Sequence, residues 1–274
     1  MRLIFFSILT LCFTFCFSQE VNYEVFQPGL ISTDDFSEGS PTITADGNTL
    51  LFTRYKSYGS KVPYFATKSA EGWGLEKVPF VDTVYTIALA PDGERAFFNT
   101  KTKVGEKTIS RVFTVSKNRD GEWRDPVELK GSLISHAGYF RVAMDGTLYM
   151  YVNNAAGNPK GVYYSEPSDY ADVKWLSDAI SVYGATVYSP LPNNDETKII
   201  VNRAGISDEE EEFLGQRGLY VHENHDGQWT VGRKIEGIPY TWIAEITPNN
   251  RLLFVKDGDI QSIRLEDLNV EWND

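Results

Sequence analysis

A repeat with a period of about 50 residues constrains the fold of this chain more than any other feature. Its marker is a pair of turn-forming residues that recurs at spacings of 46, 53, 50 and 54 residues, as Asp46-Gly47, Asp92-Gly93, Asp145-Gly146, Asp195-Glu196 and Asn249-Asn250. These residue types tolerate the positive φ of a tight hairpin turn. A short run of β-forming residues follows each pair, so every unit is predicted to contain two strands joined by a turn.

The rest of each unit also repeats. The stretch SPTITADGNTLLF from Ser40 matches SPLPNNDETKIIV from Ser189 in the character of each position. A third β-forming run follows in every unit, and then a tryptophan, 23 to 34 residues after the turn pair, at Trp73, Trp123, Trp175, Trp229 and Trp272. Units of about 50 residues with four strands each are typical of propeller blades. A β-sandwich would have no reason to repeat a tryptophan in phase. We therefore predict an all-β fold, a five-bladed β-propeller with four-stranded blades.

The last unit lacks a fourth strand of its own, because the chain ends two residues after Trp272. The N-terminal segment YEVFQPGLIS, from Tyr23, resembles the fourth-strand segment WRDPVELKGSLIS, from Trp123, in its proline, its leucine and its Ile-Ser ending. We predict that this N-terminal segment completes the last blade. That arrangement would close the ring and remove an open sheet edge.

Residues 1–18 read as a secretory signal peptide. Met1 and Arg2 give a basic start, residues 3–17 are almost all apolar, and the small residues Cys16 and Ser18 precede the expected cleavage site. Cys16 lacks the context of a lipoprotein signal. We expect one propeller domain over residues 19–274, secreted or periplasmic. Both cysteines fall in the signal peptide, so the mature chain is expected to have no disulfide.

Charge and histidine content exclude several kinds of partner. The chain has 38 acidic and 26 basic residues and a net charge of −12, which disfavours nucleic acid and anionic membrane surfaces. The apolar N-terminal segment is too short for a comfortable membrane span, and none is expected elsewhere. The three histidines, His136, His222 and His225, are predicted to lie apart, so no metal site is expected. No motif indicates a cofactor, and we expect a monomer.

The segment IALAPDGERAFF, from Ile87, resembles the Pro-Asp-Gly repeat of TolB-like, WD-like β-propellers. Pro91, Asp92 and Gly93 match that repeat. The other units depart from it, since Ala45 and Met144 replace the proline and an Asn-Asn pair replaces Asp-Gly in the last unit. The resemblance implies the fold and an exported setting. It implies nothing narrower, because binding modules and enzymes share these structural motifs.

Candidate site residues follow from the propeller architecture. The innermost strand of each blade starts at the central opening, which is where propellers commonly hold ligands. Counting back from each turn pair places ten residues there: Asp35, Glu38, Tyr85, His136, Tyr139, Arg141, Tyr188, Tyr240, Trp242 and Glu245. Aromatic rings stack on sugar faces, while charged groups bind hydroxyl or uronate groups. We predict a binding module that holds a glycan or an envelope protein in this funnel, although each tyrosine could instead pack between blades.

Two enzymatic interpretations remain open. His136, Tyr139 and Arg141 supply a base, a phenol and a cation, the set that a polysaccharide lyase would need to remove a proton beside a uronate carboxyl group. Alternatively, Asp35, Glu38 and Glu245 imitate the carboxylates of a glycoside hydrolase. The sialidase motif Ser-x-Asp-x-Gly-x-Thr-Trp is absent from the sequence. We rank a lyase above a hydrolase and a non-catalytic binder above both. Arg141 and Glu245 are also predicted to lie at one depth, where they could pair with each other.

Overall fold

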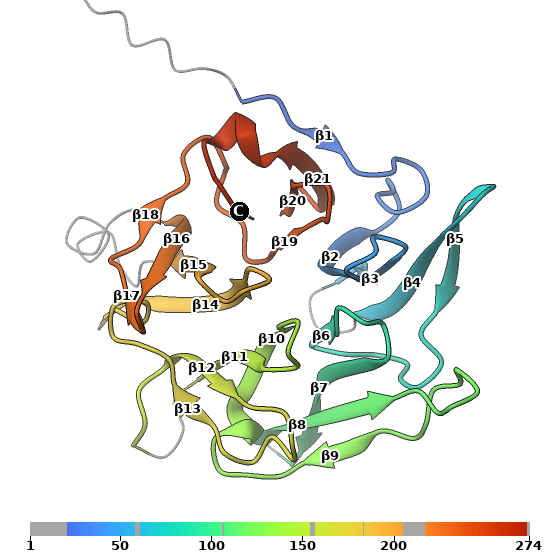
Figure 1. Cartoon of the computed structure of the whole chain (residues 1–274). Helices are drawn as coiled ribbons and strands as arrows, with labels where there is room; N and C mark the ends of the chain where they lie inside the picture. The colour runs from blue at the N-terminus through green and yellow to red at the C-terminus, as the bar shows by residue number, and fades with distance from the viewer. Residues whose placement is uncertain are drawn as a thin grey trace, which may run out of the picture.

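The strands of the five repeats form five antiparallel sheets that stand around a common axis (Figure 1). The computed structural model describes residues 21–57, 61–105, 107–153, 157–182, 184–204 and 217–272. The predicted five-bladed β-propeller is confirmed. The predicted signal peptide, residues 1–18, lies outside the described residues. In the part of the chain that is described, no helix has the length and apolar character needed to cross a membrane.

Each blade consists of strands that run in order from the axis outward. The bounds of the first two blades are β2 (Ser37–Ile43), β3 (Thr49–Tyr55), β4 (Val62–Ser69) and β5 (Gly72–Lys77), then β6 (Thr86–Leu89), β7 (Arg95–Val104), β8 (Lys107–Ser116) and β9 (Val127–Leu129). The third and fourth contain β10 (Ala137–Val142), β11 (Leu148–Val152), β12 (Gly161–Ser165) and β13 (Lys174–Trp175), then β14 (Thr186–Pro192), β15 (Lys198–Ala204), β16 (Gly218–His225), β17 (Gln228–Trp229) and β18 (Arg233–Lys234). The fifth contains β19 (Ala244–Ile246), β20 (Arg251–Lys256), β21 (Asp259–Arg264) and β1 (Glu24–Val25).

Two features complete this layout. The outer edge of blade 4 is divided between β17 and β18, which pair with different parts of β16. Two short 3₁₀ helices, η1 (Ile134–His136) and η2 (Leu265–Leu268), lie outside the sheets.

Around the axis, the first strand of each blade contacts the first strand of the next blade, and β19 contacts β2 to close the ring.

The N-terminal strand closes the ring as predicted. β1 pairs antiparallel with β21, with Glu24 opposite Ser262 and Val25 opposite Gln261. The backbone N–H of Phe26 then donates to the carbonyl of Ile260, 2.8 Å away. The fourth strand of the last blade thus comes from the opposite end of the chain, so the sheet ladder itself joins the two ends of the described chain.

The five turn pairs form the turns that their residue types predict. Their second residues all have positive φ, at 72°, 74°, 93°, 58° and 57° for Gly47, Gly93, Gly146, Glu196 and Asn250. The aspartate carboxylates cap these turns, because Oδ1 of Asp46 and Oδ1 of Asp92 each accept a hydrogen bond from the backbone N–H two residues on. The aspartates are therefore occupied as turn residues.

A β-bulge explains the repeated Ser-Pro pairs. Ser40 and Pro41 together oppose one residue of the next strand, and so do Ser189 and Pro190. In blade 3 the same position begins with Tyr139. The first bulge residue has a left-handed conformation in each case, with φ of 51° at Ser40, 53° at Tyr139 and 54° at Ser189. Three inner strands therefore bend in the same way as they pass the axis.

The core consists of five hydrophobic clusters, each shared by two neighbouring blades and each contacted by one repeated tryptophan. Trp123, for example, stacks on Phe65 of the preceding blade, with ring centroids 5.7 Å apart. Trp73, Trp175 and Trp229 lie in the outermost strands, whereas Trp123 precedes β9 by four residues. The repeat predicts largely buried positions for Trp73, Trp123, Trp175 and Trp229, and this prediction was wrong. Trp272 is buried, but the other four are half-buried at the blade edges.

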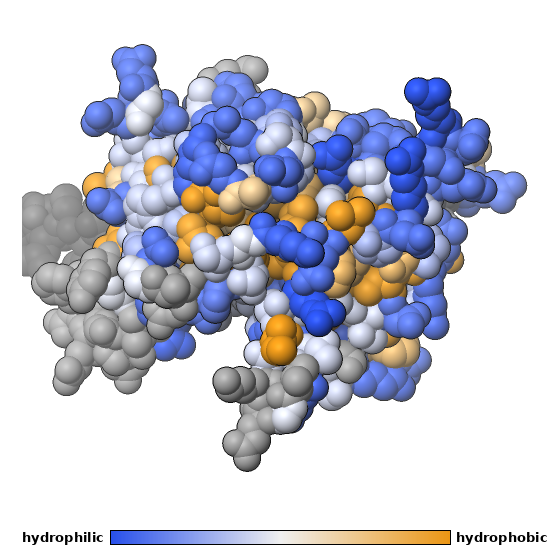
Figure 2. Space-filling model, turned by 90° about the horizontal axis from the view of Figure 1, so that it is seen from below, coloured by the Kyte–Doolittle hydropathy of each residue, from blue (hydrophilic) through white to orange (hydrophobic). Residues whose placement is uncertain are grey.

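Seen edge-on, hydrophilic residues cover most of the visible outer surface (Figure 2).

Candidate funnel site

An aromatic depression lies at the end of the ring where the inner strands begin. We call it the funnel. Its volume is about 860 Å³. All five aromatic candidates from the sequence line it, together with two aromatic residues that were not predicted: Tyr85, Tyr139, Tyr188, Tyr240 and Trp242, with Tyr55 and Tyr151. The five candidates precede or belong to first strands, whereas Tyr55 and Tyr151 lie near the ends of the second strands β3 and β11.

Four of the tyrosines contact one another. The rings of Tyr139 and Tyr188 lie 4.9 Å apart, and Tyr151 meets the rings of Tyr139 and Tyr188 edge-on at 6.2 and 6.1 Å. The hydroxyls of Tyr188 and Tyr240 share a hydrogen bond. Tyr188 is 7% exposed and Tyr240 is 44% exposed. The buried tyrosine thus positions its neighbours, and Tyr240 offers its ring to solvent.

Two lysines that were not predicted lie against the opposite part of the aromatic set. Nζ of Lys61 lies 4.7 Å from the ring centroid of Trp242 and 5.5 Å from that of Tyr85. Nζ of Lys101 lies 3.3 Å from the ring centroid of Tyr85. Such contacts are attractive because the ring face is electron-rich. Burial lowers the pKa of Lys61 to about 8, and the positive charge of Lys101 acts in the same direction.

A side pocket of about 390 Å³ adjoins the funnel and shares Tyr85, Tyr139 and Tyr151 with it. His136, at the end of η1, lines this side pocket and is exposed. Lys101 lines it as well. His136 and Tyr139 are therefore brought to one cavity, which fits two of the three roles in the lyase interpretation.

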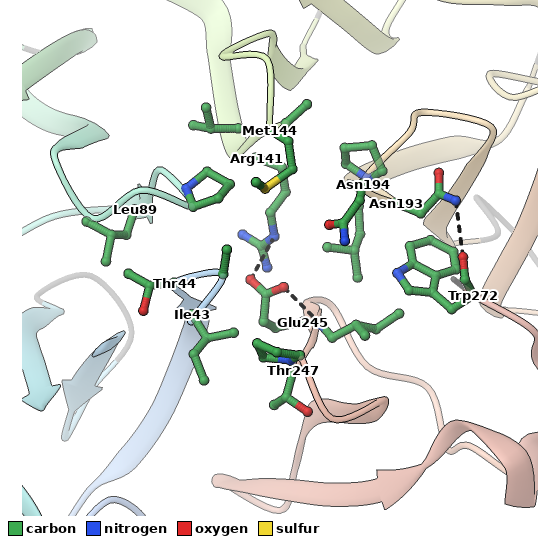
Figure 3. A pocket seen from close by; sticks show the side chains of 18 residues that line it. Ile43, Thr44, Leu89, Arg141, Met144, Asn193, Asn194, Glu245, Thr247 and Trp272 are labelled. Carbon is green, nitrogen blue, oxygen red and sulfur yellow. Dashed lines mark hydrogen bonds and ion pairs between the residues drawn. The ribbon is translucent and has the colours of Figure 1, made fainter. Parts of the chain in front are cut away.

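Arg141 lies deeper and faces the other end of the ring (Figure 3). Its Nε is 3.6 Å from Oε2 of Glu245, and the two residues are 4% and 7% exposed. The guanidinium also donates to three backbone carbonyls, those of Pro41, Phe140 and Ala244. Burial raises the pKa of Glu245 to about 7, against the opposing effect of Arg141. Arg141 lines neither the funnel nor the side pocket, so the predicted set of His136, Tyr139 and Arg141 does not meet in one cavity.

The candidate carboxylates lie in three different places. Glu38 is fully buried, with Oε1 at 3.3 Å from Nε of Arg54 and 3.0 Å from the Thr33 hydroxyl that donates to it. Burial raises the pKa of Glu38 to about 7, opposed by those two neighbours. Asp35 is exposed on a shallow depression beside the funnel, and Glu245 is held by Arg141. The carboxylate arrangement that a hydrolase needs is not formed by these residues. Within the described part of the chain, no three acidic or histidine side chains gather as metal ligands.

Known proteins resemble this chain in fold. No protein-family model matches it, and no curated protein matches it in sequence. Among solved structures, a TolB candidate from Agrobacterium tumefaciens has a TM-score of 0.54 at 16% identity, over 86% of this chain and 79% of that one. An endo-arabinanase of glycoside hydrolase family 43 from Bacillus licheniformis gives 0.48 at 11% identity, over 85% and 94% of the two chains. An oligogalacturonate lyase from Vibrio parahaemolyticus gives 0.45 at 10% identity, over 92% and 84%.

At these identities the comparisons define the class of fold alone. The structure is a five-bladed β-propeller that resembles TolB in its overall arrangement. Membership of the family with the Pro-Asp-Gly repeat stays a prediction, because no family model matches.

Proposed function

We propose that this protein is an exported binding module that holds a saccharide in the funnel. The observation that carries the proposal is the set of seven aromatic side chains that line one central depression. Tyrosine and tryptophan rings stack on the apolar faces of sugars, and their polar edges donate hydrogen bonds to sugar hydroxyls. The volume of about 860 Å³ is in the range of known small-ligand sites and leaves room for a short oligosaccharide.

The backbone of Tyr139 supports a role for its ring. Its φ of 53° is costly for a bulky residue, on the order of 1 kcal/mol or more. At the equivalent bulges of blades 1 and 4 the smaller residues Ser40 and Ser189 have this conformation. Residues in such conformations cluster at binding sites. A tyrosine at this position serves the bulge no better than serine does, so its ring is the feature that we connect to ligand binding.

The tyrosines divide between packing and contact. Tyr188 is nearly buried, so we assign it to the support of Tyr139 and Tyr240. Among the tyrosines that line the funnel, Tyr240 is the most exposed. Together with Tyr139 and Trp242 it offers the faces on which a sugar would stack. These three residues are the proposed ligand contacts.

A polysaccharide lyase is the second candidate, favoured by the presence of His136 and Tyr139 in the side pocket. In such a reaction His136 would take the proton beside the uronate carboxyl group as the bond to the leaving oxygen breaks. A carbon–carbon double bond would form, and a phenol such as Tyr139 would donate a proton to the leaving oxygen. Arg141 would take no part in this step, because it is held by Glu245 and three carbonyls.

A glycan array combined with analysis of the products tests these two functions together. Binding without cleavage supports the binding module, and unsaturated products would establish the lyase. If the array shows no bound glycan while the purified protein captures an envelope protein, the saccharide proposal fails and the protein partner replaces it.

Export is the part of the proposal that depends on residues 1–18. Mass spectrometry of the protein recovered from its native host tests it, since signal-peptide cleavage leaves a chain that begins at Gln19. A chain that retains Met1 and stays inside the cell contradicts export without affecting the funnel proposal.

A further inference from the structure

We infer that the funnel selects an anionic saccharide and that Lys101, supported by Lys61, binds its negative group. This inference deepens the proposed function and depends on it. Arg141, the cation predicted for the site, is instead paired with Glu245 and lines the cavity at the opposite end of the ring. The two lysines lie on the wall that blades 1 and 2 form, and neither was among the predicted residues.

The two positive charges share one aromatic neighbour. Lys101 and Lys61 lie 3.3 and 5.5 Å from the ring centroid of Tyr85. Lys61 is 5% exposed, whereas Lys101 is exposed and lines the side pocket. Burial is the main reason why the pKa of Lys61 is lowered, and repulsion by the like charge of Lys101 lowers it further. An anion bound at Lys101 would be attracted by both charges and would relieve the repulsion.

The hairpin of β7 and β8 extends this positive wall. Lys103 follows Lys101 by two residues on β7, so both side chains point to the same face. Ser110 and Thr108, which also line the side pocket, stand opposite these two lysines on β8. The wall thus combines ammonium and hydroxyl groups. In a chain with a net charge of −12, such a wall is a local exception that can attract an anion to this position.

The funnel and the adjoining side pocket therefore differ in chemical character. The tyrosines of blades 3 and 4, with Tyr240 ahead of β19, form the side where a sugar ring would stack. The side pocket, which holds Lys101 and shares Tyr85, Tyr139 and Tyr151 with the funnel, forms the side where a carboxylate or sulfate group would bind. A uronic acid or sulfated sugar carries both features in one residue, which is why we assign this class of ligand.

The test compares two trisaccharides that differ only in charge, a galacturonate trisaccharide and its carboxyl-reduced galactose counterpart. We expect the protein to bind the acidic form at least about tenfold more tightly. Lys101→Met should remove most of that preference and leave the affinity for the neutral form unchanged. Lys117→Met is the matched control, because Lys117 lies on the same blade but pairs with Glu94 outside the funnel. It should leave both affinities unchanged.

The outcomes separate this inference from the proposed function. Equal binding of both trisaccharides by the unmodified protein, or an unchanged preference in the folded Lys101→Met variant, overturns the role of the lysines and leaves a neutral glycan site. Failure of the unmodified protein to bind any saccharide overturns the proposed function itself. Higher salt supplies a second readout, since it should weaken binding of the acidic form only.

Discussion

Arg141 and Glu245 belong to the first strands of blades 3 and 5, and their side chains meet near the axis with Nε and Oε2 3.6 Å apart (Figure 3). Arg141 also donates to the carbonyl of Pro41 in blade 1. One guanidinium thus joins blades 1, 3 and 5. Blade 3 is not adjacent to blade 1 or to blade 5 in the ring. The pair lies between the funnel and a small cavity of about 110 Å³ at the turn end of the ring.

Arg141→Met is expected to lower the free energy of unfolding by roughly 3–5 kcal/mol, because it leaves the Glu245 carboxylate buried without its cation. The loss should be measurable by chemical denaturation. A double variant, Arg141→Leu with Glu245→Leu, removes both charges and should recover much of that stability. Saccharide binding in the funnel should be retained in every variant that folds. A stable Arg141→Met variant that no longer binds saccharide would show instead that Arg141 contacts the ligand.

Stability should depend on pH through Glu245, whose pKa burial raises from 4.5 to about 7. Below pH 4.5 this carboxyl is protonated in the folded and the unfolded chain. Between pH 4.5 and 7 the unfolded chain releases the proton while the folded chain keeps it, so this group lowers the free energy of unfolding as the pH rises. One pKa unit corresponds to about 1.4 kcal/mol, so the effect is a few kcal/mol at most.

Denaturation curves of the unmodified protein and of Glu245→Gln at a series of pH values isolate this contribution. The difference between the two proteins should change across that window and stay constant above it. Glu38, whose pKa is also raised to about 7, contributes equally to both curves. A difference that is the same at pH 4.5 and pH 7 would contradict the burial that we assign to Glu245.

Removal of the N-terminal strand should destabilise the ring. A chain that starts at residue 33 loses the ladder between β1 and β21 and also Ile31, which is fully buried. Unpairing a strand and exposing the apolar surface beneath it should cost several kcal/mol of a total of about 10 kcal/mol. A chain that starts at Gln19 is the control. Equal melting temperatures for the two chains would contradict a closing role for β1.

The architecture could be predicted because local backbone requirements repeat with the blades. Positive φ demands particular residues, so the five turn pairs identify the five blades even where the intervening sequence differs. The bulges were less accessible to prediction. Ser40 and Ser189 look alike, but Tyr139 occupies the same place without resembling them. A bulge also changes which face the next side chain points to, so a simple count misplaces residues such as Glu38.

The candidate site was predicted in part, since the count covered first strands only. Tyr55 and Lys101 each stand nine residues after the aspartate of their turn pair, at corresponding points of β3 and β7. A count along the second strands would have found both. Lys61 offers no such signal, because it precedes β4 after a connection whose length differs between blades. Its place near Trp242 follows from packing between the neighbouring blades 1 and 5.

Saccharide binding to two single variants tests the central claim most directly. Trp242 lines the funnel, and Met144 is 52% exposed at the opposite end of the ring. We predict that Trp242→Ala weakens binding of the galacturonate trisaccharide at least about tenfold, as expected when a stacking ring is lost, while Met144→Ala binds it like the unmodified protein. Titration calorimetry on variants with normal melting temperatures gives both values. Normal affinity in Trp242→Ala, or a loss in Met144→Ala alone, would contradict a binding site in the funnel.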